Sequence, residues 1–134
     1  DYVIYPEALK SETTVVDDIK VTTRIGKTMY SAKFRSPSKK LHWGQSDLAS
    51  QGIFLDFKKQ HEADLNCKMV LVSESNCYLF SEVFARVRNS ELPSDIYVVL
   101  DSEYAIEEWE KAKQHLDYND FQLIAFAKKV APLL

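Results

Sequence analysis

The chain has 134 residues, 46% of them hydrophobic and 12% aromatic, which is enough for a normal core and excludes a disordered chain. This length predicts a single domain, residues 1–134. The net charge is −3, but residues 1–60 carry 10 Lys/Arg against 7 Asp/Glu, whereas residues 61–134 carry 7 against 13. The basic first half could meet a polyanion, and an asymmetry without function is the alternative.

The sequence contains no apolar run of the ~20 residues that a membrane helix needs, and no signal peptide. We therefore expect a cytoplasmic protein with no membrane partner. Cys67 and Cys77 fit no zinc pattern and are too few for a disulfide framework, so we expect buried free thiols. Because the chain opens at Asp1 directly on a strand-like run, we interpret it as a fragment of a longer multidomain protein with further domains or subunits.

The first third of the chain predicts three strands. Residues 2–5 are β-prone and end at Pro6, residues 15–24 are rich in β-branched side chains, and Gly26 marks a turn. Residues 28–35 alternate between two faces. Tyr30, Ala32 and Phe34 form the face that we expect to meet the core, and Met29, Ser31, Lys33 and Arg35 form the other.

The middle of the chain predicts a helix, a strand and a second helix. Residues 46–63 have helical spacing, although Gly52 weakens the middle by ~1 kcal/mol. Residues 67–72 are a compact apolar run and predict a buried strand. Residues 78–88 return to helical spacing.

The last third is predicted to be mainly helical. Residues 96–100 fit a strand or the start of a helix, and periodicity cannot decide between them. Residues 102–116 predict a helix capped by Ser102 or Asp101, and residues 119–131 predict another. The resulting fold class is α/β (α+β): a mixed sheet with a central hairpin, flanked by helices.

Two strands of the predicted hairpin bring acidic and basic side chains toward one edge of the sheet. Asp17 and Asp18 lie in the first strand and Lys33 in the second. Carboxylate oxygens suit Mg²⁺, and a nearby lysine can orient a water or offset charge on a phosphate. The alternative is a hairpin with a solvated face, which is the commoner meaning of such a pattern.

This arrangement resembles the PD-(D/E)XK nuclease superfamily, and more closely the endonuclease domains of bacterial anti-phage defence effectors. The resemblance rests on Asp17-Asp18-Ile19, Gly26, Tyr30-Ser31-Ala32-Lys33 and Asp56-Phe57, and covers about residues 2–80. It implies a restriction-endonuclease-like fold and a magnesium-dependent site. Asp18, Lys33 and Ser31 would be catalytic, with Asp18, Asp17 and Glu7 as the metal ligands.

Ser31 departs from the family pattern, because Glu or Gln stands at that position in the family. A hydroxyl is a poor Mg²⁺ ligand. Either Glu7 or an acid upstream of the chain compensates, or the site is inactive.

Residues after the predicted hairpin are candidates for contact with nucleic acid, most simply DNA. Arg35, Lys39 and Lys40 can meet phosphates, and Trp43 can stack on a base. The alternative for Trp43 is a ring that closes over the core. Two histidines, His61 and His115, receive no role, and Tyr97, Trp109 and Tyr118 are interpreted as packing residues.

Two functions follow from these observations. The first is a metal-dependent endonuclease domain, active or degenerate, that acts on nucleic acid in bacterial defence. The second is a non-enzymatic interaction or immunity module that uses the acidic C-terminal helices. Ser31 favours the second, and the ordered match of Asp18, Lys33 and the following helix and strand favours the first.

Overall fold

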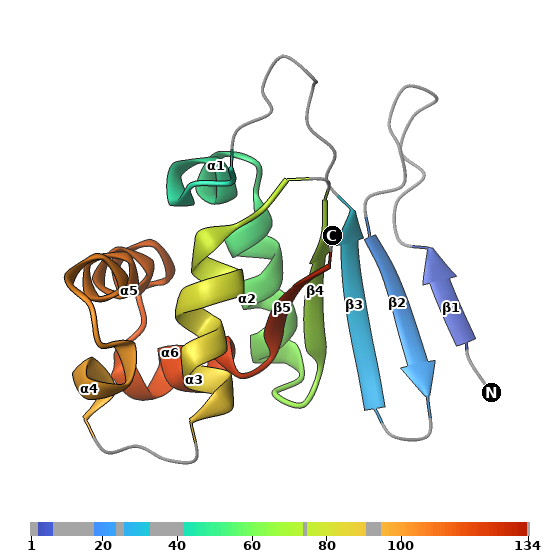
Figure 1. The fold of residues 1–134 in the computed structure, drawn as a ribbon. Coiled ribbons are helices and arrows are strands. Elements are labelled where there is room, and N and C mark those ends of the chain that lie inside the picture. Colours follow the sequence, from blue (N-terminus) through green and yellow to red (C-terminus); the bar gives the residue numbers. More distant parts are fainter. Residues whose placement is uncertain are drawn as a thin grey trace.

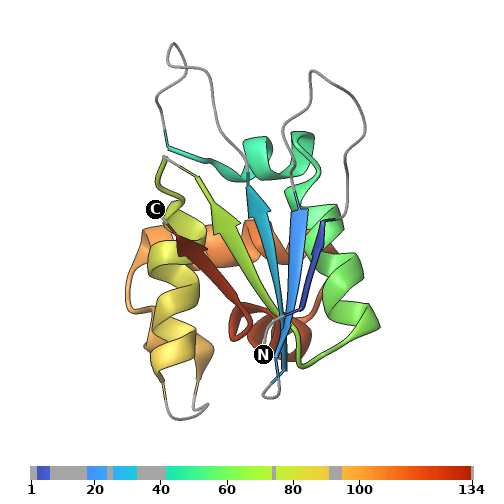
Figure 2. The same cartoon turned by 90° about the vertical axis from the view of Figure 1, so that its right-hand side faces the viewer.

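The computed structural model describes residues 3–6, 18–23, 26–32, 42–73, 75–90 and 95–133. These residues form a mixed α/β fold built on a five-stranded sheet of order β1-β2-β3-β4-β5. The strands are β1 (Val3–Pro6), β2 (Asp18–Thr23), β3 (Gly26–Ala32), β4 (Lys68–Val72) and β5 (Val130–Leu133). The described helices gather on one face of the sheet (Figure 1), and a turn of 90° brings the strands in front of them (Figure 2).

Neighbouring strands are antiparallel in the first part of the sheet and parallel in the second. β1, β2 and β3 are antiparallel neighbours, in the pairing expected for residues 15–24 and 28–35. β3 and β4 are parallel, because the chain between them returns through helices to the end where β3 began. The expectation that residues 67–72 would join the same mixed sheet is confirmed.

The helix expected over residues 46–63 is two helices, α1 (Gln45–Ser50) and α2 (Ile53–Ala63). The break lies at Gly52, which has φ 76° and caps α2 in the left-handed conformation. A residue with a Cβ is strained in that conformation, so glycine allows the chain to change direction there. The prediction of one continuous helix was wrong for this reason.

Four helical segments are described between residues 79 and 116. A π-helical segment, η2 (Leu79–Val83), runs directly into α3 (Phe84–Asn89). The open question over residues 96–100 resolves as helix α4 (Ile96–Leu100), since the Asp95 side chain caps its first turn by accepting from the Tyr97 amide. Ser102, one of the two expected caps, begins α5 (Glu103–Leu116) and accepts from the Ala105 amide at 3.1 Å.

The final helix is shorter than the sequence predicts. α6 (Asp120–Ala127) starts from Asn119, whose side chain exchanges hydrogen bonds with Gln122 in a capping box. The expected helix over residues 119–131 is wrong in its last part, because residues 130–133 form β5 beside β4. This strand is defined by its parallel pairing with β4 rather than by its own sequence.

The expected orientation of β3 was also wrong. Met29 and Ser31 are buried, with 4% and 1% of their surface exposed, whereas Tyr30 and Ala32 are only half-buried. The Met29–Ser31 face therefore meets the helix layer. The alternation of side chains was predicted correctly, but the helices cover the opposite face.

Aromatic rings fill the core between the helices. Phe84 of α3 lies at the centre, 5.5 Å from the ring of Phe80 and 6.1 Å from the rings of Trp109 and Phe126. Trp109 and Tyr118 pack as predicted, but Tyr97 is 39% exposed and is not a core residue. Cys67 and Cys77 are buried free thiols, as expected. Within the described part of the chain, every helix is too short or too polar to cross a membrane.

Candidate functional site

The predicted catalytic strands meet at one edge of the sheet. Asp18, the first residue of β2, lies directly opposite Ser31 near the end of β3. Ser31 in turn lies beside Leu71 near the end of β4. The carboxyl ends of parallel strands are where open α/β sheets most often bind ligands. Asp18, Ser31 and the end of β4 therefore share this edge, which we call the β3–β4 edge.

The Ser31 hydroxyl at this edge could form a hydrogen bond that it does not form with any described residue. Its Oγ is buried and has no hydrogen-bond partner among the described residues. A buried hydroxyl without a partner is costly, so a water, an ion or a ligand oxygen at this point would stabilise it. A hydroxyl, a carboxylate and backbone carbonyls are all oxygen donors, which matches Mg²⁺ in kind and not a thiolate-binding metal.

Trp43 lies beside the β3–β4 edge but does not offer its ring to a ligand. The side chain is 4% exposed, and its Nε1 donates to the Ser73 Oγ at 2.8 Å, just after β4. The Trp43 amide donates to the Asn76 carbonyl at 2.7 Å, and a parallel bridge joins Trp43 to Cys77. The expectation of base stacking by Trp43 is wrong in this structure. The alternative, a ring that closes over the core, is what the burial shows.

The other predicted site residues lie outside the described ranges. These are Glu7, Asp17, Lys33, Arg35, Lys39 and Lys40. Asp18 and Ser31 are therefore the predicted catalytic residues that the described structure brings together, and they meet as a cross-strand pair.

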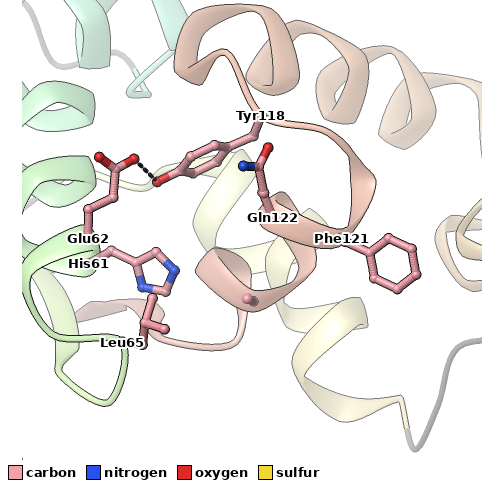
Figure 3. A pocket seen from close by; sticks show the side chains of 7 residues that line it. His61, Glu62, Leu65, Tyr118, Phe121 and Gln122 are labelled. Carbon is pink, nitrogen blue, oxygen red and sulfur yellow. Dashed lines mark hydrogen bonds between the residues drawn. The ribbon is translucent and has the colours of Figure 1, made fainter.

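A pocket lies elsewhere, between the end of α2 and the start of α6 (Figure 3). Its volume is about 410 Å³, within the range of small-molecule sites. Its wall consists of His61, Glu62, Leu65, Tyr118, Phe121, Gln122 and Ala125, which we call the α2–α6 pocket. Leu65 is 63% exposed and Phe121 85% exposed, so the rim presents apolar surface to solvent.

Polar groups in the α2–α6 pocket are arranged around one carboxylate. The Tyr118 hydroxyl donates to Glu62 Oε2 at 2.9 Å (Figure 3). Burial, together with this hydrogen bond and the charge of Glu62, raises the pKa of Tyr118 well above its usual range. The phenol therefore stays protonated at neutral pH and keeps its proton directed at Glu62.

His61 is a second buried titratable residue of the pocket. Its side chain is 4% exposed, its ring meets Phe126 edge-on at 5.5 Å, and its Nδ1 has no hydrogen-bond partner among the described residues. Burial lowers the pKa of His61, and the charge of Lys129 lowers it further while Glu62 opposes the shift. The imidazole is therefore neutral at pH 7, with one nitrogen able to accept a hydrogen bond.

No protein-family model matches this chain, and neither a curated protein nor a solved structure matches it significantly. The β3–β4 edge and the α2–α6 pocket are therefore interpreted from their own geometry.

The sequence predicted the first of these sites and missed the second. Glu62 and Tyr118 are 56 positions apart in the sequence, so no local spacing could pair the Glu62 carboxylate with the Tyr118 hydroxyl. One signal was present: His61 falls on the same helical stripe as Phe54 and Phe57, which marks it as buried.

Proposed function

We propose that this chain is a metal-dependent endonuclease domain that acts on nucleic acid, most simply DNA, in bacterial defence. We further propose that it works in the cytoplasm with additional domains or subunits. The observation that carries the proposal is the pairing of Asp18 with Ser31 on adjacent strands. Ser31 lies two residues before Lys33 in the sequence. The pairing joins the acidic strand and the Ser-x-Lys strand at the edge where β3 and β4 end.

A restriction-endonuclease-like fold is part of this proposal. An antiparallel β1-β2-β3 set with a parallel β4 beside β3, and helices on one face, supports it. The chain between β3 and β4 carries helices α1 and α2.

Each site residue has a proposed role. Asp18, with Asp17 and Glu7, would hold Mg²⁺, an ion that supplies charge stabilisation to a phosphate and lowers the pKa of a bound water. Lys33 would offset charge at the scissile phosphate. Ser31 would occupy the position between them, with its unpartnered Oγ available to a bound water.

Contact with the nucleic acid backbone is assigned to basic residues after β3. Arg35, Lys39 and Lys40 would meet phosphates, and Trp43 is left out because it is buried. Binding should therefore weaken steeply as salt rises, since phosphate contacts release counterions. Charge reversal at Lys39 and Lys40 should reduce the steepness of this salt dependence.

The test is cleavage of supercoiled plasmid with and without Mg²⁺. Lys33→Ala should abolish Mg²⁺-dependent cleavage, and Asp18→Asn should do the same by weakening metal binding. Lys27→Ala is the matched control, because Lys27 is an exposed lysine at the opposite end of β3. Cleavage that survives Lys33→Ala, or that fails equally in Lys27→Ala, contradicts the assigned roles.

A second function, an interaction or immunity module, is favoured by a different observation. Large apolar side chains are exposed on the C-terminal helices: Val98 at 68%, Tyr104 at 55% and Phe121 at 85%. Exposed large apolar side chains are common at protein interfaces. Absence of cleavage by the wild-type chain, with nucleic acid binding that is absent at low salt, would favour this second function.

A further inference from the structure

The α2–α6 pocket has a chemical character that the proposed nuclease function does not use. It lies beside Leu65, ahead of the first residue of β4, whereas Asp18 and Ser31 lie at the edge where β3 and β4 end. Figure 1 shows the end of α2 and the start of α6 toward the end of the sheet where β4 begins. A ligand of this pocket would therefore not occupy the β3–β4 edge.

Hydrogen-bond acceptors outnumber donors on the wall of this pocket. Glu62 supplies a carboxylate, the Tyr118 oxygen retains lone pairs after donating its proton, and a neutral His61 has one acceptor nitrogen. The donors on the wall are the Gln122 amide and the one N–H of the neutral His61, and the Gln122 carbonyl accepts from the Asn119 amide at 2.9 Å. A well-matched ligand must therefore bring donors.

Electrostatics favour a positive ligand for three reasons. Glu62 is the charged residue on the wall. The carboxyl ends of α2 and α5 lie next to the pocket, at Glu62–Leu65 and at Tyr118, and helix carboxyl ends carry partial negative charge. The rings of Tyr118 and Phe121 attract cations through their faces.

One lysine of the chain, Lys58, already lies over the face of the Tyr118 ring. The Lys58 Nζ lies 5.0 Å from the centre of the Tyr118 ring and donates to the Leu116 carbonyl at 2.5 Å. Lys58 is thereby held at the end of α5 and does not line the pocket. Lys129, which affects His61 by its charge, also lies outside the wall.

The rest of the wall is apolar. Leu65, Ala125 and the exposed ring of Phe121 frame the opening. The His61 Nδ1 is buried with no partner among the described residues, so the molecule contains a polar atom here whose hydrogen bond is still to be made. An apolar frame around acceptors and one carboxylate suits a cation with an apolar body.

We propose that the α2–α6 pocket binds an organic cation, a guanidinium or amidinium group on an apolar stem, with its N–H groups directed at Glu62. The same chemistry is available from a small guanidinium compound and from an arginine side chain of another protein. The proposal is independent of Asp18, Ser31 and Lys33, so loss of nuclease activity would not affect it.

The first experiment titrates the wild-type chain with benzamidine, followed by amide chemical shifts and calorimetry. Benzamide, which is neutral and of the same shape, is the matched ligand control. We expect saturable binding of benzamidine with shifts at Glu62, Tyr118 and Phe121, and binding of benzamide about tenfold weaker because it lacks the charge-assisted hydrogen bond. Equal affinity for the two compounds overturns the assignment of a cation.

The second experiment tests the carboxylate. Glu62→Gln keeps an acceptor for the Tyr118 hydroxyl but removes the charge, so benzamidine affinity should fall about tenfold. Glu107→Gln is the control, because Glu107 is exposed on α5 and lies outside the pocket wall. Both variants should keep the thermal unfolding midpoint of the wild type. Unchanged benzamidine affinity in a folded Glu62→Gln variant overturns the proposal.

A third arm separates the two sources of the cation. Agmatine represents a small guanidinium ligand, and a blocked tripeptide with a central arginine represents a protein segment. Tighter binding of agmatine identifies a small-molecule site, and tighter binding of the tripeptide identifies a protein partner. Absence of saturable binding for benzamidine, agmatine and the tripeptide alike overturns the proposal.

Discussion

The indole of Trp43 and the hydroxyl of Ser73 are joined by a buried hydrogen bond of 2.8 Å. It connects the segment that leads into α1 with the segment that leaves β4, so two connections at the β3–β4 edge hold each other in position. Ser73 Oγ also accepts from the Ser75 amide at 3.1 Å.

Replacement of Trp43 by Phe should therefore destabilise the fold without a direct effect on the proposed nucleic acid contacts. We expect a loss of about 1–3 kcal/mol, from the lost ring volume and the lost donor to Ser73. Urea denaturation of Trp43→Phe, Ser73→Ala and the double variant would measure the coupling between the two residues. A variant of wild-type stability that binds DNA more weakly would instead indicate a ring that contacts nucleic acid.

Stability should depend on pH through His61. Its pKa is lowered in the folded chain, so between that value and the ordinary pKa near 6.5 the unfolded chain binds the extra proton. Stability is therefore highest above pH 6.5 and falls as the pH drops toward the folded pKa. Burial is the main cause of this fall, and the charges of Glu62 and Lys129 act on it in opposite directions.

The variant His61→Phe should flatten this dependence between about pH 7.5 and 5, because the group that titrates is gone. Denaturant unfolding across that range provides the measurement. His115→Gln is the matched control, since His115 is an exposed histidine on α5. An unchanged slope in His61→Phe would show that another group is responsible.

Asp120 should make the fold sensitive to stronger acid. Burial acts to raise its pKa, but hydrogen bonds from Trp109 at 3.0 Å and from Lys113 at 3.1 Å outweigh it, so the pKa lies below 3.8. A carboxyl with a lowered folded pKa stabilises the fold above its ordinary pKa, and this stabilisation is lost as the pH falls through the folded value.

Asp120→Asn should cost about 1 kcal/mol at neutral pH and should remove this loss in acid. Fluorescence of Trp109, whose Nε1 donates to Asp120, can follow unfolding during acid titration. Asp117→Asn is the control: Asp117 has φ 55°, which asparagine tolerates, and its carboxylate is exposed. Equal acid sensitivity in both variants would argue against the Trp109–Asp120 contact as the cause.

Gly52 should be hard to replace even though space is available. A Cβ at Gly52 would meet nothing within 4 Å, so any cost comes from its φ of 76° alone. Gly52→Ala should destabilise by about 1–2 kcal/mol, and Gly52→Asn by less because asparagine enters the left-handed region more readily. Thermal unfolding of the two variants gives the comparison, and equal stability of both with wild type would contradict it.

Most secondary structure could be predicted, because long periodic segments such as α5 contain their own signal. β5 could not be, since Val130–Leu133 follows a helix directly and becomes a strand only by pairing with β4. The prediction of which face of β3 is buried was wrong for a related reason. Alternation tells which side chains share a face, but whether helices cover the face of Ser31 or of Tyr30 depends on the rest of the chain.

The candidate site was predictable in its strand pairing and not in its exact register or surroundings. The turn was expected at Gly26, but Gly26 is the first residue of β3 and pairs with Thr23, and this register places Asp18 opposite Ser31. Trp43 could not be assigned from sequence, because an aromatic residue among lysines fits both a contact surface and a core. Its partner Ser73 is 30 positions away, beyond any local pattern.

The strands stand in the sheet in the same order as in the chain, with β5 last. During synthesis, β1 to β4 can therefore pair as they emerge, whereas the outer edge of β4 must wait until residues 73–129 have been made. At 5–20 residues per second this wait is about 3–11 s. For that time Lys68–Val72, a strand with four apolar residues, keeps unpaired backbone groups along one side. A ribosome pause within α5 would lengthen the period in which this edge is open to chaperones or to other nascent chains.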